Sequence, residues 1–327
     1  MSTTFDSVLL IAFGGPTRAD EVRPFLQNVT RGRPIPPERI EAVARHYDLI
    51  GGCSPLNRLT FGQAHALAAT LRAQGPALPV FTGMRNWHPY VHETLSEMAA
   101  AGHRRAVGVI LSAQQTEASW ERYQATVTAA RAKVGAGAPA VVYAPRWHDH
   151  PLFVEAVAEC TAAALAQLPP ALGSAAHLVF TAHSVPTAMA ASSAYVAQIE
   201  AGASAVAERL GRKRWSLAYQ SRSGNPRESW LEPDIGELLR RLAAAGTGTV
   251  VVIPIGFVCD HVEVLYDLDI EARAVADQLG LVFVRAPTVN DHPVFIRMLA
   301  EVVRRTAAGD DAGAAAGSVA GTTPARG

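Results

Sequence analysis

Residues 249–271 read TVVVIPIGFVCDHVEVLYDLDIE, and this stretch decides the fold class. It opens with a continuous run of β-branched residues, which is typical of a strand buried on both faces of a parallel sheet. Beyond residue 255 the chain opens into a segment that we expect to be a helix. A buried strand that leads into a helix is the repeating unit of a sheet covered by helices on both faces.

The same alternation extends along most of the chain. Seven further apolar runs are expected to be strands, and segments with helical periodicity, such as 91–101 and 235–245, lie between them. These expected strands are 7–13, 79–84, 106–111, 140–144, 176–182, 215–220 and 281–286. Strands and helices that alternate in this way predict a doubly wound α/β architecture.

Short segments also recur in the two halves of the chain. MAAAG at 98–102 precedes the strand expected at 106–111, and LAAAG at 242–246 precedes the strand that starts at 249. A polar stretch that reaches a tyrosine follows each of these two strands. The recurrence favours two α/β domains of similar construction.

The domain boundary is expected near the proline-rich stretch 145–151. We therefore predict a first domain at 1–147 and a second at 148–292, with a helix at 293–306 that packs back on the first. Residues 307–327 are mostly Ala, Gly, Thr, Ser and Asp. Such a composition cannot bury a core, so we expect a disordered tail there.

Composition excludes several classes of function. The 327 residues carry a formal net charge of zero, which argues against bulk attraction to nucleic acid or to an acidic membrane surface. No window holds the ~20 apolar residues of a membrane span, and the start lacks a secretory pattern. We therefore expect a cytoplasmic protein without stable membrane insertion. The cysteines, Cys53, Cys160 and Cys259, are too far apart in sequence to predict a disulfide framework or an iron–sulfur site.

His183 is a candidate site residue because it ends an apolar strand. Open α/β sheets bind ligands beyond the carboxyl ends of their strands. An imidazole titrates near neutral pH and can accept a proton there. A histidine that only bonds the neighbouring backbone is an equally good interpretation of this position alone.

Glu263, Asp267 and Glu271 recur every four residues in the segment after the strand at 249–255. On an α-helix they would form one acidic stripe, and like charges at this spacing destabilise a helix. A solvated acidic face is the common explanation. The apolar residues between them favour a buried helix instead, and a buried acidic row needs a partner. Carboxylates beside an imidazole suit a first-row divalent metal ion.

A glycine-containing loop at 51–57 follows two arginines, Arg31 and Arg33. Arginines beside such a loop suit carboxylate recognition, although an ordinary glycine turn with solvated arginines explains the pattern equally well. No GxGxxG follows the first strand, which counts against a dinucleotide site.

Seven stretches resemble the ferrochelatase family, and they occur in the family's order between about residues 7 and 306. The stretches are FGGP (13–16), IGGCSPL (50–56), RNWHPY (85–90), TAHSVP (181–186), YQSRSG (219–224), WLEPD (230–234) and 256–271. The resemblance is closest to the soluble bacterial members. It implies two Rossmann-like domains of the chelatase type, each with a four-stranded parallel sheet flanked by helices, and a porphyrin cleft between them.

The resemblance also implies a reaction, in which Fe(II) enters a porphyrin and two protons leave. His183 and Glu263 fall on the family's catalytic residues. Asp267 and Glu271 fall on an acidic ridge thought to guide the metal, so all four are expected to contact it. The residues expected to contact the porphyrin are Thr17, Arg31, Arg45, Ser54, Tyr123 and Trp230.

Coproporphyrin III is the favoured substrate, and protoporphyrin IX is the alternative. Two positions leave this choice open: Thr17 stands where many coproporphyrin-using relatives have tyrosine, and His46 stands where an arginine is often found. A cobalt or nickel tetrapyrrole chelatase and a non-catalytic haem carrier are further alternatives. We expect porphyrin and ferrous iron as ligands, no prosthetic group, no iron–sulfur cluster, a monomer, and transient contact with neighbouring haem-pathway enzymes.

Overall fold

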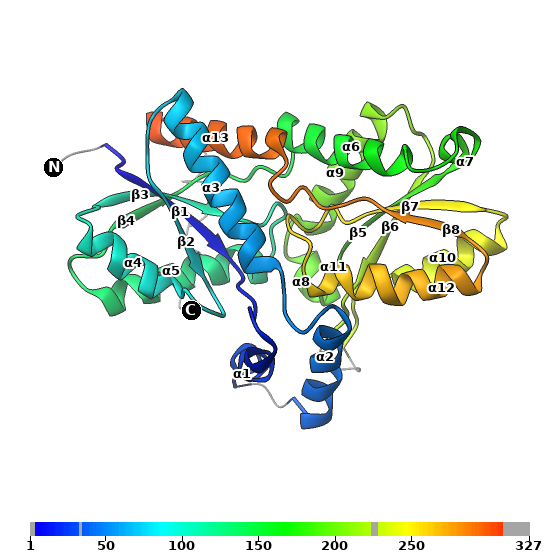
Figure 1. The fold of residues 1–327 in the computed structure, drawn as a ribbon, viewed down its shortest axis with the longest axis horizontal. Helices are drawn as coiled ribbons and strands as arrows, with labels where there is room; N and C mark the ends of the chain where they lie inside the picture. The colour runs from blue at the N-terminus through cyan, green and yellow to red at the C-terminus, as the bar shows by residue number, and fades with distance from the viewer. Residues whose placement is uncertain (1–3, 33–34, 224–227, 310–327) are drawn as a thin grey trace, which may run out of the picture.

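The computed structural model describes residues 4–32, 35–223 and 228–309. Its core is formed by two four-stranded sheets, and every strand pairing in them is parallel (Figure 1). The first sheet contains β1 (Ser7–Ala12), β2 (Val80–Met84), β3 (Arg105–Ile110) and β4 (Ala140–Tyr143). The second contains β5 (His177–His183), β6 (Trp215–Gln220), β7 (Thr249–Ile253) and β8 (Val282–Arg285).

The two sheets have the same topology, with orders β2-β1-β3-β4 and β6-β5-β7-β8. Each strand of one half therefore has a counterpart in the other, as the repeated segments indicate. All eight expected strands are present, and their ends differ from the expected ones by a residue or two. The predicted fold class, two similar α/β domains with parallel sheets, is confirmed.

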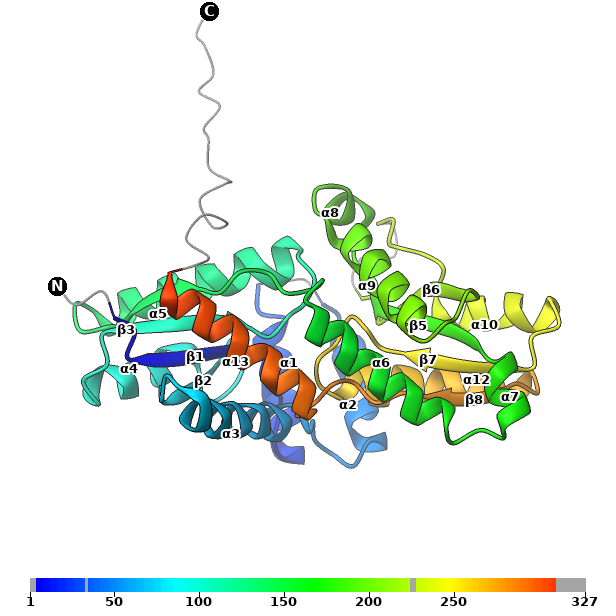
Figure 2. The same ribbon diagram turned by 90° about the horizontal axis from the view of Figure 1, so that it is seen from above.

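Helices cover both faces of each sheet (Figure 2). The first half contains α1 (Val22–Val29), α2 (Pro37–Leu49), α3 (Leu56–Gln74), α4 (Val91–Ala100) and α5 (Arg122–Val134), with short 3₁₀ and π segments at η1 (Ala19–Glu21) and η2 (Glu117–Glu121). The second half contains α6 (Pro151–Leu165), α7 (Pro170–Ala175), α8 (Thr187–Ala191), α9 (Tyr195–Arg209), α10 (Ile235–Ala244), α11 (Val262–Leu265), the π segment η3 (Asp267–Ala272), α12 (Arg273–Gln278) and α13 (Pro293–Ala308).

The continuous apolar runs of the strands follow from this double cover. Val8 and Leu10 of β1 pack in the cluster that contains α3 and α13, whereas Leu9 and Ile11 pack against α4 and α5. Successive side chains of a strand point to opposite faces, so a strand covered on both sides needs an apolar residue at every position.

Helix α13 returns from the second sheet and packs on α3, α6 and β3 (Figure 2). It begins at the expected residue and continues to Ala308, where Gly309 ends it in the left-handed conformation with φ of 86°. Ala307 and Ala308 of the expected tail are therefore helical, and residues 310–327 lie outside the described residues. None of the helices in the described ranges is long and apolar enough to cross a membrane.

Glutamine side chains connect the two halves. The buried Gln63 of α3 donates through Nε2 to the Asn290 carbonyl at 2.8 Å and to the Val258 carbonyl at 3.2 Å. Gln114, after β3, donates to the Ile255 carbonyl at 3.3 Å. These bonds satisfy backbone carbonyls in the loops that follow β7 and β8. They therefore fix those loops against the first half.

Candidate active site

His183 is the last residue of β5, and both its backbone and its ring are held in place. The ring Nδ1 donates to the Ser184 carbonyl, and the His183 carbonyl accepts a hydrogen bond from the Tyr195 hydroxyl at 2.9 Å. This leaves Nε2 to face Glu263, whose Oε1 lies 3.6 Å away. Because Nδ1 carries a proton, Nε2 is the nitrogen that accepts and releases one.

Glu263 lies in the first turn of α11, directly opposite this histidine. Its amide donates to Nδ1 of His261 at 3.2 Å, and its carbonyl accepts from Nε2 of Gln220. The side chains of His183 and Glu263 are 30% and 38% exposed. The pair is thus held by protein on one side and open to solvent on the other, where a ligand can reach it.

The two side chains shift each other's pKa in opposite directions. Burial lowers the pKa of His183 and is the largest single influence, but the Glu263 carboxylate, the Ser184 carbonyl and the Asp267 charge together outweigh it and raise the pKa above its ordinary value. Burial raises the pKa of Glu263, and His183, with a smaller contribution from His261, outweighs burial and lowers the pKa. At neutral pH the ligand-free site therefore holds an imidazolium paired with a carboxylate.

Asp267 is the most buried carboxyl group of the predicted row. Its carboxylate accepts a hydrogen bond from the Ser221 hydroxyl, and Ser221 adopts a φ of 62°, which is unusual for a residue other than glycine. Burial raises the pKa of Asp267 to about 7, helped by the charges of Glu263 and Glu271 and opposed by Ser221. This group therefore changes charge near neutral pH.

Asp267 and Glu271 line a cavity of about 170 Å³ beside the pair. It is lined by Gln220, Ser221, Asp234, Ile235, Gly236, Arg240, Asp267, Glu271, Ala272 and Val275. Glu271 is exposed, so the row runs from a buried carboxyl group to a solvated one. Among the described residues, no group of three or more His, Cys, Asp or Glu side chains is placed to hold a metal ion together.

The helix that carries this row differs from the expected continuous α-helix. α11 ends at Leu265, and the next turn, η3, is a π-helix in which the Glu271 amide donates to the Tyr266 carbonyl at 2.9 Å. The regular α-helix expected through this row is therefore wrong, although Asp267 and Glu271 still line one cavity. π turns occur mostly as single insertions in α-helices, frequently at functional sites.

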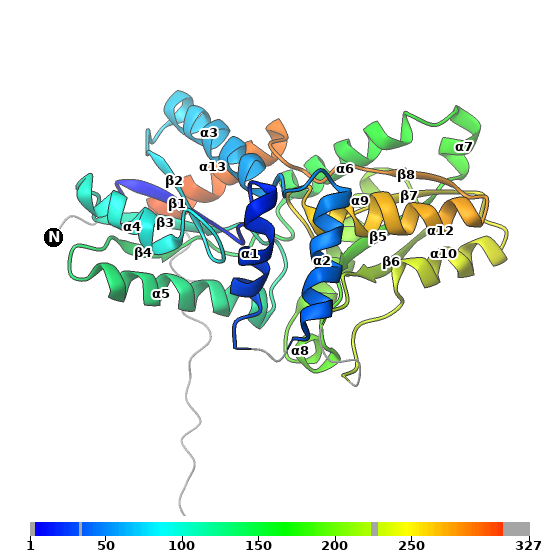
Figure 3. The same ribbon diagram turned by 60° about the horizontal axis from the view of Figure 1, so that its bottom comes forward.

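Aromatic residues of the first half lie close to Glu263. Tyr47 of α2 and Tyr123 of α5 are buried, and burial raises the pKa of both phenols, with a further rise from the Glu263 charge. The His46 ring stacks on the Tyr266 ring with 3.6 Å between centroids. The candidate site therefore lies where α2, placed between the two halves in Figure 3, meets the segment after β7.

Two of the six residues expected to contact a porphyrin are aromatic and buried. Tyr123 lies under the guanidinium of Arg85, which is 5.8 Å from the ring centre. Trp230 pairs with Pro186 through a backbone bridge, and its buried Nε1 has no hydrogen-bond partner among the described residues. A buried indole N–H without a partner is unusual.

The other four residues expected to contact a porphyrin are polar, and their contact with it stays a prediction. Ser54 is buried; its amide donates to the Pro16 carbonyl at 2.9 Å, and its Oγ accepts from the Leu56 amide at 3.3 Å. Thr17 is exposed and bonds Glu21 at 3.0 Å through its hydroxyl. Arg31 and Arg45 are exposed, at the end of α1 and on α2 respectively.

Several residues around the pair were not among the candidates. They are Tyr47, Tyr195, Gln220, Ser221 and His261. Gln220 ends β6 directly beside His183, so the strand-end argument that identified the histidine also identifies this glutamine. Nothing in the sequence pattern singles out Tyr195, which reaches His183 from a helix.

Comparison with known proteins places the chain in a family. Residues 6–307 match the model of the family described as Ferrochelatase. The chain is 47% identical over 302 residues to the coproporphyrin III ferrochelatase of Mycobacterium avium, covering 91% of this chain and 87% of that one. It is 44% identical to the coproporphyrin III ferrochelatase of Mycolicibacterium smegmatis, with 92% and 89% covered, and 46% identical to that of Frankia alni, with 91% and 79% covered.

Solved structures show the same fold at low sequence identity. The sirohydrochlorin chelatase SirB from Bacillus subtilis subspecies spizizenii, in complex with cobalt, is 12% identical, has a TM-score of 0.58, and is matched over 94% of this chain and 97% of that one. SirB from Bacillus subtilis with Fe3+ is 11% identical, has a TM-score of 0.60, and is matched over 94% and 98%. At these identities the likeness concerns the fold alone.

Proposed function

The chain belongs to the ferrochelatase family of metal-inserting enzymes, and we propose that it inserts Fe(II) into coproporphyrin III during haem biosynthesis, giving coprohaem. The proposal for the substrate rests on one observation: relatives at 44–47% identity, matched over more than nine-tenths of this chain, are coproporphyrin III ferrochelatases. Thr17 and His46 keep protoporphyrin IX open as the alternative substrate, but the relatives reported above are named for coproporphyrin III.

Insertion exchanges two pyrrole protons for one iron ion, so the site must accept protons and tolerate a cation. We propose that His183 is the base and that its Nε2 takes the first proton. In the ligand-free site this imidazole is already protonated because of Glu263. Fe(II) near Glu263 offsets the carboxylate charge and thereby lowers the pKa of His183. The imidazole then releases its proton to solvent and becomes a base when the metal is present.

Glu263 has two roles in this proposal. Its carboxylate lies 3.6 Å from Nε2, so once the iron has left it for the porphyrin, the carboxylate stabilises the imidazolium that forms when a pyrrole proton is accepted. It also shares that proton and passes it toward the solvent-exposed side of the pair, which frees His183 for the second proton. The sum is balanced: Fe(II) plus the porphyrin gives the iron porphyrin and two protons.

Asp267 and Glu271 are proposed to guide iron toward the pair. Both line the cavity beside Gln220, with Glu271 exposed to solvent and Asp267 buried. Carboxylate oxygens replace the water bound to Fe(II) one ligand at a time. Since burial and neighbouring charges raise the pKa of Asp267 to about 7, its affinity for a cation rises as the pH passes through that value.

Asp267→Asn is expected to raise the KM for Fe(II) by about tenfold, which corresponds to about 1.4 kcal/mol. The variant removes a carboxylate that attracts a cation but that is only partly ionised near neutral pH. The KM for porphyrin changes less. The wild-type KM for iron falls as the pH rises through about 7, and the variant loses this dependence. Anaerobic initial rates at varied Fe(II) and pH measure both effects.

Asp277→Asn is the matched control, because it removes the same charge from an exposed position on α12. It should leave the KM for iron unchanged. An unchanged KM for iron in Asp267→Asn, or an equal rise in Asp277→Asn, would count against a delivery role for Asp267.

Competition between the two porphyrins tests the proposed substrate. We expect the wild-type protein, given equal coproporphyrin III and protoporphyrin IX with limiting Fe(II), to form coprohaem at least about tenfold faster, a difference of about 1.4 kcal/mol in transition-state binding. Products are separated by chromatography after an anaerobic reaction. Faster formation of protohaem would overturn the substrate assignment and leave family membership intact.

A further inference from the structure

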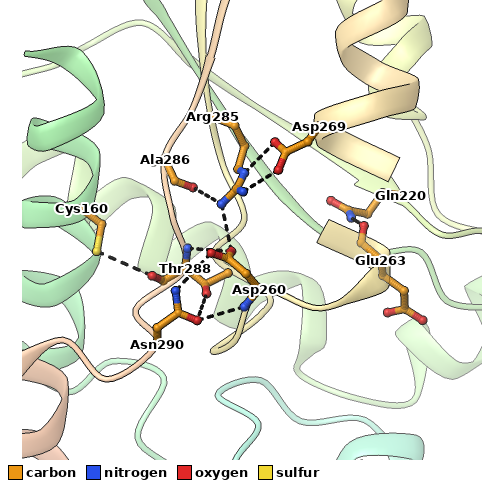
Figure 4. Close-up of polar contacts among 9 residues, drawn as sticks. All are labelled: Cys160, Gln220, Asp260, Glu263, Asp269, Arg285, Ala286, Thr288 and Asn290. Carbon is orange, nitrogen blue, oxygen red and sulfur yellow. Dashed lines mark hydrogen bonds and ion pairs between the residues drawn. The ribbon is translucent and has the colours of Figure 1, made fainter. Parts of the chain in front are cut away.

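Arg285, at the end of β8, contacts two carboxylates of the segment that carries Glu263 (Figure 4). Its Nη2 and Nε donate to the two carboxylate oxygens of Asp269 at 2.6 and 2.9 Å. Its Nη1 donates to Oδ1 of Asp260 at 2.9 Å. The Arg285 side chain is 11% exposed, so the contacts are largely screened from water. One side chain thus joins the two ends of the segment 260–269.

The Asp260 end is fixed by further bonds (Figure 4). Its carboxylate also accepts from the Thr288 amide at 3.2 Å and from Nδ2 of Asn290 at 3.1 Å, and its own amide donates to Oδ1 of Asn290 at 3.0 Å. The Asn290 carbonyl in turn accepts from Gln63 of α3 at 2.8 Å. The anchor of the segment therefore extends from β8 to the first half of the molecule.

Glu263 depends on these anchors for its position. Its carboxylate is paired with His183 at 3.6 Å, and Figure 4 shows it pointing away from the Arg285 network. The two bonds of its backbone go to Gln220 and to His261 of the same segment. The backbone between Asp260 and Asp269 therefore decides where the carboxylate lies relative to the histidine.

We propose that Arg285 is a positioning residue for metal insertion: through Asp260 and Asp269 it fixes the segment that holds Glu263 opposite His183. This inference rests on the proposed function. Arginine suits the role because its planar group presents donors in fixed directions and engages one carboxylate with two bonds and another with a third. A lysine ammonium at the same place pairs with one carboxylate and leaves the other free to move.

Arg285→Lys tests the proposal while keeping the positive charge. We expect kcat for Fe(II) insertion to fall roughly tenfold to a hundredfold, the range expected when a reacting group is misplaced by about 1 Å. The dissociation constant for coproporphyrin III, measured by fluorescence, stays within about twofold, because Arg285 lies behind the segment and not at the pair. The assay temperature is kept well below the measured Tm of each variant.

Arg273→Lys is the matched control. Arg273 also reaches β8 from the same region, but it donates to the Phe283 carbonyl at 3.3 Å and lies over the Phe283 ring at 4.9 Å. It should keep wild-type kcat. An equal loss of kcat in the two variants would overturn the positioning role, as would wild-type kcat in Arg285→Lys.

Asp269→Asn provides a second variant if Arg285→Lys fails to fold, since it keeps the side-chain shape and one acceptor. Its kcat is expected to fall with porphyrin affinity unchanged; a wild-type kcat overturns the proposal. If both single variants fold, the kcat of the double variant should be little lower than that of the worse single variant, because Arg285 and Asp269 act as one unit. A double variant whose loss of kcat equals the product of the two single losses would overturn the proposal.

The failure of this inference is distinguishable from failure of the proposed function. If the wild-type protein inserts no Fe(II), the function fails before any variant is compared. If the wild-type protein is active and the Arg285 and Asp269 variants keep its kcat, only the positioning role fails.

Discussion

His183→Ala is expected to abolish measurable Fe(II) insertion while porphyrin binding survives. Loss of a general base commonly costs about 10²- to 10⁴-fold in rate, and the cost here lies at the upper end because Nε2 is the ring nitrogen that faces the reacting side of the site. The porphyrin should be bound by the surfaces around the site and not by His183, so the dissociation constant for coproporphyrin III changes little. Single-turnover absorbance and fluorescence quenching measure the two quantities.

His177→Gln is the control, since it alters a histidine on the same strand. His177 begins β5, and its Nε2 lies 2.9 Å from the Ser216 hydroxyl, at the opposite end of the strand from the site. The control should retain activity. Turnover in His183→Ala that is comparable to wild type would remove the histidine from the mechanism.

Glu263→Gln is expected to lower kcat by about 10²- to 10³-fold. The amide keeps the shape of the side chain but cannot stabilise an imidazolium or carry its proton away. A second effect separates this role from a structural one. In the ligand-free wild-type protein Glu263 raises the pKa of His183, whereas in the variant burial remains without the main opposing charge, so the pKa falls. Titration of the His183 ring by NMR measures the shift.

Glu237→Gln is the control for this change, because Glu237 is on the surface of α10 and pairs with Arg241. It should leave both kcat and the His183 pKa as in wild type. An unaltered His183 pKa in Glu263→Gln would contradict the pairing, and an unaltered kcat would contradict its use in catalysis.

The strands could be predicted from sequence because a strand buried on both faces is a continuous run of apolar residues. β1 and β7 are apolar at nearly every position and are buried along their whole length, as strands covered on both faces require. The same reasoning located His183, because a residue that follows such a strand must lie at the ligand-binding edge of the sheet. This part of the site follows from local pattern alone.

The geometry around Glu263 could not be predicted in this way. The spacing of Glu263, Asp267 and Glu271 is compatible with an α-helix, and the π turn at η3 forms where Asp267 bonds Ser221 and Asp269 pairs with Arg285. Ser221 directly follows β6 and is 46 residues from Asp267, and Arg285 ends β8 and is 16 residues from Asp269, so both partners lie beyond the reach of helical spacing. Tertiary bonds of this kind override the local preference for a regular helix.

The aromatic surroundings of the His183–Glu263 pair could not be predicted from the sequence either. Tyr47 and Tyr195 contribute to the surroundings of the pair from helices, and helical spacing gives no sign that one aromatic residue faces a reaction site while another faces a core. Only the packing of α2 and α9 places them.

The most direct test of the whole account is the rate at which the wild-type protein inserts Fe(II) into coproporphyrin III under anaerobic conditions, followed by absorbance. The account predicts catalysed, saturable formation of coprohaem, with two protons released per iron inserted. Tight porphyrin binding without metal insertion would contradict it and would leave a chain with the fold of the family that carries a porphyrin and performs no chemistry on it.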